Sequence, residues 1–355
     1  MAMTTGGQSV RGETMMAREA AAAAALCGAQ ISRNAALMRQ LGAVLRAKNP
    51  PFAATIARGS SDQAAAFAKM LFETRVATPT LSHAPSIGAL YQASSPRLRG
   101  VPLFAISQSG RSPDLLRAAE DAQRQGAILI ALVNDTDSPL AARADVVVPL
   151  HAGVETSVAA TKSFIATLVA LTHLCAAWAE DRALLAALEG IEPLLAAAAR
   201  HDWRPALPIL SPATRLLVLG RGFTLPIAGE AALKFKEVAG IHAEAFSLAE
   251  VAHGPMTLIT AGDPVLIFAP GDAARAGLDA RLADFGARGA RTILVDSFST
   301  PPPATLTLPA LGAPDPALAA IAMIQSFYPL ANALALARGR DPDHPPFLAK
   351  VTKTL

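Results

Sequence analysis

Charged residues, cysteines and aromatic residues are all scarce in this sequence of 355 residues. Charged residues make up 17% of it, the net charge is +3 and no basic block occurs. This argues against nucleic acid as a partner, because such proteins concentrate lysine and arginine on one face. The two cysteines, Cys27 and Cys175, form neither a metal spacing nor a disulfide framework. We therefore expect a reduced, cytoplasmic protein.

Long apolar segments are also lacking. The first sixteen residues have no apolar core behind positive charge, so they do not predict a signal peptide. The most apolar run, Ser163–Ala179, is shorter than the roughly 20 residues that a membrane span needs. We predict a buried helix there and no contact with a membrane. His151, His173 and His242 have no ligand spacing, so we predict neither a metal nor another cofactor.

What the sequence does contain is a large apolar fraction, 52%, arranged in an internal repeat. The segment FAATIARGSSDQAAAFAKMLFE is matched by TRLLVLGRGFTLPIAGEAALKFKEV, and two further strand-like segments follow in each copy. The equivalent residues are Gly59 and Gly222, Pro102 and Pro264, and Gly126 and Gly289, which lie 163, 162 and 163 residues apart. Three matches at one offset indicate a duplicated domain.

Each copy alternates about five short apolar strands with amphipathic helices. This pattern predicts an α/β fold in which a parallel sheet is covered by helices on both faces. We expect an N-terminal segment over residues 1–34, a first domain over 35–180, a second over 200–340, and a tail over 341–355. A final helix is expected at about 316–337.

A cluster of hydroxyl groups follows the strand VPLFAI in the first copy. In SQSGRSPD, Ser107, Ser109 and Ser112 surround the predicted start of a helix at Pro113. A helix start presents free backbone N–H groups and a positive dipole end, which suit an anion such as phosphate. The alternative is that these serines merely cap the helix.

The turn RGSSD likewise places two serines, Ser60 and Ser61, at the predicted start of a helix, here on the neighbouring strand end. Two such turns favour an anion site over simple capping. The second copy reads APGD there, and its Asp272 would repel phosphate. We therefore expect one phosphate site per chain, in the first half.

These motifs resemble those of the sugar isomerase (SIS) domain family, which binds phosphosugars. The resemblance covers about residues 35–355 and rests on RGSS, SQSGRSPD, GVETSVAATKSF, GRGFTLPIAGEAALKFKEVAGIHAEAFSLAEVAHGP and LAKVTKTL. The order of two such domains looks like the isomerase half of glucosamine-6-phosphate synthase and like deaminases built from that half. It implies two tandem, flavodoxin-like, doubly wound domains.

The resemblance also implies roles for individual residues. The residues implied to hold the phosphate are Ser61, Ser107, Gln108, Ser109 and Ser112, and those implied to line the sugar are Glu155 and Val158. The implied acid–base residues are Lys234, Glu237 and His253, and Lys350 is implied to meet the carbonyl or imine carbon. It further implies a homodimer in which His253 is donated across the interface.

The chemistry is consistent with these residue types. One carboxylate can move a proton from C2 to C1 of an amino sugar, and Lys234 and Glu237 share a helix face at their spacing of three. Without the resemblance, Lys234 and Glu237 would be interpreted as a surface ion pair. His253 would be an incidental loop histidine, and Lys350 would be a solvated lysine of the tail. The family match favours the catalytic reading.

The chain departs from the synthase pattern in two ways. It has Ala160 where the synthase has serine and Pro346 where the synthase has arginine, so the identity of the sugar stays open. Only about 50 residues precede the first repeat, without the glutaminase domain that the synthase carries there. We therefore expect the ammonia-releasing direction, glucosamine 6-phosphate to fructose 6-phosphate. The alternatives are a galactosamine-6-phosphate deaminase, a deglycase of fructosamine 6-phosphates, and a non-catalytic phosphosugar sensor.

Overall fold

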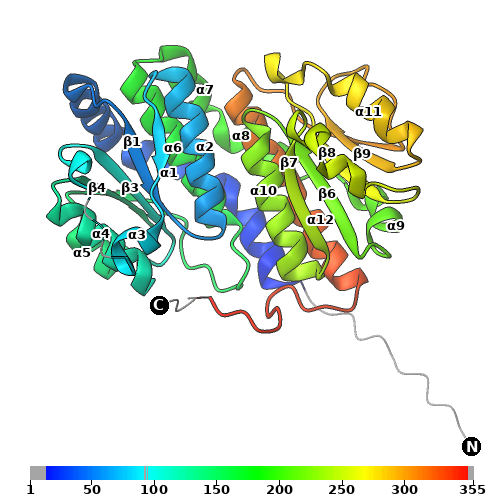
Figure 1. Ribbon diagram of the computed structural model, residues 1–355, viewed down its shortest axis with the longest axis horizontal. Helices are drawn as coiled ribbons and strands as arrows, with labels where there is room; N and C mark the ends of the chain where they lie inside the picture. Colours follow the sequence, from blue (N-terminus) through cyan, green and yellow to red (C-terminus); the bar gives the residue numbers. More distant parts are fainter. Residues whose placement is uncertain (1–12, 92, 94, 351–355) are drawn as a thin grey trace, which may run out of the picture.

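The computed structural model describes residues 13–91, 93 and 95–350, whose strands form two five-stranded parallel sheets (Figure 1). The strand orders are β2-β1-β3-β4-β5 and β10-β9-β8-β6-β7. The first sheet contains β1 (Ala53–Ile56), β2 (Thr80–Ser82), β3 (Pro102–Ser107), β4 (Ile128–Val133) and β5 (Val146–Pro149). The second contains β6 (Arg215–Gly220), β7 (His242–Ser247), β8 (Pro264–Phe268), β9 (Arg291–Asp296) and β10 (Leu306–Pro309).

Helices connect the strands and cover both faces of each sheet. The α-helices are α1 (Met15–Lys48), α2 (Ser60–Arg75), α3 (Pro85–Ala89), α4 (Pro113–Arg124), α5 (Pro139–Arg143), α6 (Lys162–Ala179), α7 (Arg182–Glu189), α8 (Ile191–Ala198), α9 (Leu207–Leu210), α10 (Thr224–Lys234), α11 (Leu278–Ala287) and α12 (Pro316–Ala337). Single 3-10 turns are η1 (Pro96–Leu98), η2 (Arg204–Ala206), η4 (Glu250–His253), η5 (Pro255–Leu258) and η6 (Ala273–Arg275), and η3 (Phe235–Ala239) is a π-helical turn.

The two halves of the chain share one hydrophobic core. The inner faces of both sheets pack on a central layer of helices that includes α1, α2, α6, α10 and α12 (Figure 1). The outer faces carry separate, smaller cores under α4 and α5 in the first half and under α11 in the second. Strand β3 is buried at every position, which explains its continuous apolar run, since a central parallel strand is covered on both faces.

The structure confirms the predicted fold, two α/β units with parallel sheets. Read from β2 and from β7, the two strand orders are the same, and Pro102 and Pro264 open equivalent strands. Gly59 and Gly222 both take left-handed backbone conformations, with φ of +56° and +59°. That conformation favours glycine, so the repeat keeps this residue after the first strand of each half.

Helix α1 is the longest element, with 34 residues and hence a length of about 51 Å. It packs on α6 in the first half and on α8 and α12 further along the chain. The boundary that we predict between residues 34 and 35 falls inside this helix, and the predicted domain limits stay predictions.

Helices α6 and α12 are long and apolar enough to cross a membrane by length and composition alone. However, 89% of the apolar window in α6 and 83% of that in α12 is buried inside the protein. The buried helix predicted over Ser163–Ala179 is therefore present as α6, and both helices behave as core elements.

Candidate active site

Two serine-rich turns lie at adjacent strand ends of the first sheet. Strands β1 and β3 pair in parallel, so the turn at Gly59–Ser61 and the turn at Ser107–Ser112 meet at the same edge. Arg58 in the first turn donates to the carboxylate of Asp114 in the first turn of α4, with Nη2 and Oδ2 3.0 Å apart. Asp114 is buried, so this ion pair ties the two turns together.

The hydroxyl groups of these turns are used only in part. Ser107 is buried, and its Oγ accepts a hydrogen bond from Gly110 N at 3.1 Å. Ser112 is the N-cap of α4, yet among the described residues its side chain makes no capping hydrogen bond. The backbone carbonyl of Gln108 accepts bonds from Asn134 and Asp135 in the turn after β4. The side chains of Gln108 and Ser109 are half-buried beside it.

The second half contributes a buried cluster of charged side chains at the end of α10. Lys234 Nζ lies 2.5 Å from Glu237 Oε2, 3.4 Å from Glu230 Oε1 and 3.0 Å from Ser60 Oγ of α2. Lys234 and Glu230 are almost fully buried, whereas the side chain of Glu237 is 22% exposed. The π-helical turn η3 carries Glu237, and such turns are frequent at functional sites.

Burial and neighbouring charges set the protonation of this cluster. Burial raises the pKa of Glu230 to about 7, although the positive charge of Lys234 acts to lower it. Burial alone would lower the pKa of Lys234, but the carboxylates of Glu230 and Glu237 raise it above its ordinary value. Tyr328 of α12 donates to Glu230 Oε1 at 3.1 Å, and burial raises the pKa of its hydroxyl as well. Lys234 is therefore a permanent cation between two acids.

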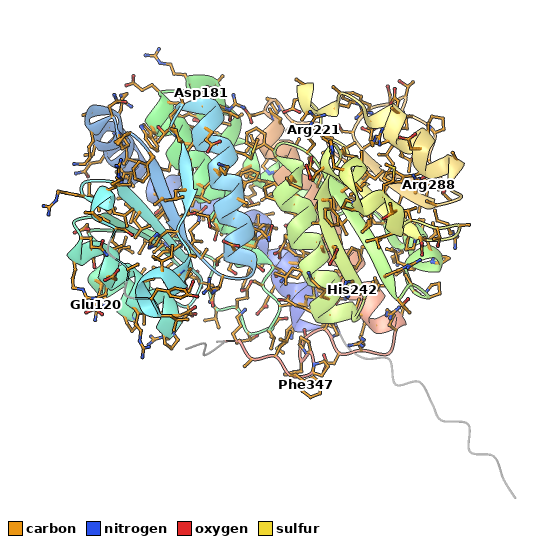
Figure 2. All side chains as sticks on the ribbon, viewed as in Figure 1. Glu120, Asp181, Arg221, His242, Arg288 and Phe347 are labelled. Atoms are coloured by element: carbon orange, nitrogen blue, oxygen red, sulfur yellow. The ribbon has the colours of Figure 1, made fainter. Side chains whose placement is uncertain are left out.

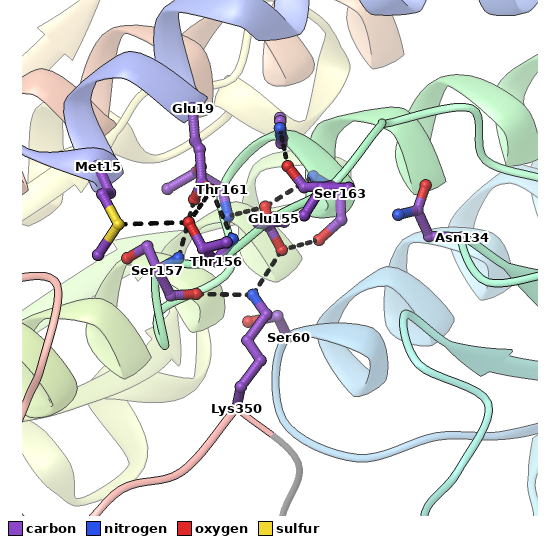
Figure 3. Close-up of polar contacts among 12 residues, drawn as sticks. Met15, Glu19, Ser60, Asn134, Glu155, Thr156, Ser157, Thr161, Ser163 and Lys350 are labelled. Carbon is purple, nitrogen blue, oxygen red and sulfur yellow. Dashed lines mark hydrogen bonds and ion pairs between the residues drawn. The ribbon is translucent and has the colours of Figure 1, made fainter.

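The tail and the loop before α6 meet at a second charged contact (Figure 3). Lys350 Nζ lies 2.8 Å from Glu155 Oε2 and 2.7 Å from the carbonyl oxygen of Ser157. The side chain of Glu155 is fully buried and also accepts bonds from Thr161 N, Ser163 N and Ser163 Oγ. These N–H groups belong to the start of α6, whose dipole favours a carboxylate.

The protonation of Glu155 depends on that contact. Its burial would raise the pKa, but the charge of Lys350 and the hydrogen bonds together hold the pKa below its usual value. The carboxylate is therefore ionised at neutral pH. Val158, in the same loop, is half-buried and its N–H donates to the carbonyl of Asp343 in the tail at 3.3 Å.

His253 stands apart from these groups. It ends η4, is exposed, and among the described residues no hydrogen bond or ion pair joins it to Glu237 or Lys234. The structure thus brings together Lys234 with Glu237, and Lys350 with Glu155 and the Val158 loop, but leaves His253 on the surface of the single chain. Phe347, also in the tail, is fully exposed (Figure 2).

Comparison with known proteins identifies the family. The model of the SIS domain matches residues 52–177 and again residues 209–336, one match for each sheet. The chain belongs to the SIS domain family.

Curated relatives of this SIS protein bear the name of an isomerizing aminotransferase. It is 33% identical over 282 residues to glutamine–fructose-6-phosphate aminotransferase (isomerizing) of Bradyrhizobium diazoefficiens, covering 72% of this chain and 44% of the relative. It is 32% identical over 326 residues to the enzyme of that name from Thermus thermophilus, covering 88% of this chain and 53% of the relative. The SIS chain thus spans about half the length of these curated relatives.

Solved structures show the same fold along nearly the whole chain. A protein of Silicibacter pomeroyi, provisionally described as a phosphosugar isomerase, matches with a TM-score of 0.87 and 39% identity, covering 93% of this SIS chain and all of that one. The C-terminal domain of glucosamine-fructose-6-phosphate aminotransferase from Francisella tularensis matches with a TM-score of 0.85 and 25% identity, covering 95% and 100%.

Sequence reasoning missed Glu230 and Ser60 as members of the Lys234 cluster. Glu230 lies four residues before Lys234, a spacing that signals an ion pair, but surface pairs of this spacing are common. Its carboxylate accepts a hydrogen bond from Tyr328, nearly a hundred residues away. Only the apolar residues around it in EAALKFKEV could have indicated that this SIS helix is buried on the face carrying its charges.

Proposed function

We propose that this chain is a cytoplasmic aminosugar-phosphate deaminase that converts glucosamine 6-phosphate and water to fructose 6-phosphate and ammonia. One observation carries the proposal. Lys234 Nζ contacts both Glu237 of the second half and Ser60 of the first half, and Ser60 belongs to the first serine turn, Gly59–Ser61. This contact supports the proposal that a carboxylate suited to proton transfer acts next to the edge where the phosphate would bind.

The phosphate end of the substrate would be held in the first half. The proposed phosphate ligands are the hydroxyls of Ser61, Ser107, Ser109 and Ser112, together with Gln108 and the free N–H groups at the start of α4. The uncommitted side chain of Ser112 supports this role, because a hydroxyl that is not used for capping can donate to a phosphate oxygen.

Glu237 would act as the base and then as the acid. Its carboxylate removes the proton from C2 of the open-chain sugar and returns it to C1. The C1 carbonyl oxygen gains a proton and the amine loses one, which leaves a hydroxyl at C1 and an imine at C2. Water then adds to C2, the C–N bond breaks and ammonia departs. Lys234 orients Glu237 through the 2.5 Å contact between Nζ and Oε2.

The sugar end would be held by the loop and the tail. Glu155 and Val158 would line the sugar, and Lys350 would polarise the carbonyl or imine oxygen or form an imine itself. The geometry supports this assignment because the tail brings Lys350 onto Glu155 across 195 residues of sequence.

His253 would open the sugar ring from a second copy of the chain. Its exposure, and the lack of any hydrogen bond or ion pair to Glu237 or Lys234 among the described residues, support donation across a homodimer interface. Mixing Glu237→Gln and His253→Ala proteins tests this, because each variant alone is inactive and random exchange restores about a quarter of the sites. No recovery in a mixture shown to contain mixed dimers would exclude the shared site.

Ammonia release from glucosamine 6-phosphate tests the function itself. Wild type should release ammonia and fructose 6-phosphate in equal amounts, and Glu237→Gln should lose activity by at least about a hundredfold, as expected for loss of a general base. Glu189→Gln, on the exposed face of α7, is the matched control and should retain activity. A fully active Glu237→Gln protein would overturn the mechanism.

A panel of sugars separates the alternatives. Activity on galactosamine 6-phosphate alone, or release of an amino acid from a fructosamine 6-phosphate adduct, would change the substrate while keeping the mechanism. Binding of phosphosugars without any turnover would indicate a sensor. The relatives' names, which include fructose 6-phosphate, favour an aminosugar phosphate within this panel.

A further inference from the structure

The start of α1 meets both segments that hold Lys350. The tail residue Asp343 accepts hydrogen bonds from Met15 N and Met16 N, at 2.9 and 2.7 Å through its two carboxylate oxygens. A carboxylate at this end of a 34-residue helix is favoured by the helix dipole and satisfies N–H groups that have no partner within the helix. The tail is therefore fixed to α1 seven residues before Lys350.

One turn further along α1, Glu19 holds the loop that precedes α6 (Figure 3). Its Oε1 accepts bonds from Thr156 N at 2.5 Å and from Thr156 Oγ1 at 3.0 Å, and its Oε2 accepts a bond from Ser157 N at 3.2 Å. Glu19 is only 8% exposed. Within the described part of the chain no lysine, arginine or histidine forms an ion pair with it, so these loop bonds alone compensate its burial.

Three consecutive backbone N–H groups of the loop are thus satisfied from outside it. Those of Thr156 and Ser157 bind Glu19, and that of Val158 binds the carbonyl of Asp343. The peptide between Ser157 and Val158 is held at both ends, since its carbonyl accepts from Lys350 Nζ at 2.7 Å. Glu19 and the tail together fix the direction in which that carbonyl points.

We propose that Glu19 is a positioning residue whose carboxylate orients the 155–158 loop so that Glu155 and the Ser157 carbonyl receive the Lys350 ammonium. As a catalytic inference it rests on the proposed function. Both carboxylate oxygens are needed, because Thr156 N and Ser157 N face different oxygens. A glutamine side chain at position 19 would turn its own amide N–H toward one of these two backbone N–H groups. That buried backbone donor would then have no acceptor.

The substitution Glu19→Gln tests the proposal in wild-type and Lys350→Met backgrounds. It should lower kcat/KM at least about tenfold in the wild type and less than about twofold when Lys350 is already absent, because coupled residues are not additive. Glu189→Gln, on exposed α7, should change neither. An equal loss in both backgrounds would show that Glu19 acts independently of Lys350 and would overturn the proposal.

Amide hydrogen exchange separates this proposal from the function. In Glu19→Gln the amides of residues 155–158 and of the tail should exchange faster, while those of β3 and β8 should be unchanged. This readout holds even if wild type releases no ammonia, in which case only the proposed function fails. Unchanged exchange in the loop and tail would overturn the positioning role. If Glu19→Gln does not fold, Glu19→Asp, which keeps both oxygens but is shorter, takes its place and should give the same pattern at smaller amplitude.

Discussion

The buried Lys234 gives the sharpest quantitative prediction. Lys234→Met keeps the length and apolar character of the side chain but removes the ammonium between Glu230 and Glu237. The change leaves a fully buried carboxylate without its cation, and breaking a buried pair in this way costs about 3–5 kcal/mol of unfolding free energy. We expect a loss in this range at pH 8.

The loss should depend on pH in a defined direction. The pKa of Glu230 is about 7 in the folded protein with Lys234 present, above its value of 4.5 in the unfolded chain. A carboxyl group with a raised folded pKa makes stability fall as pH rises from the unfolded to the folded pKa. Removing Lys234 raises the folded pKa of Glu230 further, because the charge of Lys234 lowers it. The fall in stability then continues to higher pH, by about 1.4 kcal/mol for each unit of added pKa shift.

Denaturant unfolding followed by the fluorescence of the buried Trp178 and Trp203 measures both quantities. The difference between wild type and Lys234→Met should be larger at pH 8 than at pH 5, because Glu230 ionises at higher pH in the variant. Lys236→Met, two residues on and exposed, is the control and should change stability by less than about 0.5 kcal/mol. A loss below about 1 kcal/mol, or one that is equal at both pH values, would refute the account of this cluster.

Three further predictions concern the loop and the serine turns. Lys350→Met should destabilise the protein by about 2 kcal/mol at pH 8 and less at pH 4, because the buried Glu155 then loses the partner that keeps its pKa low; thermal unfolding at the two pH values checks this. Ser112→Ala should weaken binding of phosphorylated sugars, measured by calorimetry, and leave the melting temperature nearly unchanged, whereas a large fall in melting temperature would show that the hydroxyl is structural. Gly110→Ala should cost more than about 1 kcal/mol, because φ is +61° and the added Cβ would collide with Ser138; an unchanged denaturation midpoint would contradict this.

Much of the fold followed from the sequence because its signals were local and repeated. The offset of 163 residues between Gly59 and Gly222 predicted two copies, and both glycines occupy the same left-handed position. The apolar run before Ser107 predicted a buried central strand, and Pro113 marked the start of the following helix, as found in β3 and α4. The helix expected at about 316–337 is present as α12.

The remaining features could not be predicted because they depend on contacts between distant segments. Glu19 is one charged residue in an alanine-rich helix, and its binding to the loop joins residues 137 positions apart. Asp343 reads as part of a proline-rich tail, yet it fixes the start of α1 from 328 positions away. Glu230 was missed for the same reason, since its hydrogen-bond partners Tyr328 and Ser60 are distant in the sequence.

The long helix α1 has a consequence for how substrate enters. It packs against α6 of the first half and against α12 of the second, and the two sheets bury their inner faces in one common core. Rotating one half away from the other would separate the packed apolar side chains of that core. A hinge motion that opens the two halves therefore costs much free energy. Any opening must instead involve short surface segments that leave the core intact, such as the tail segment that holds Lys350 on Glu155.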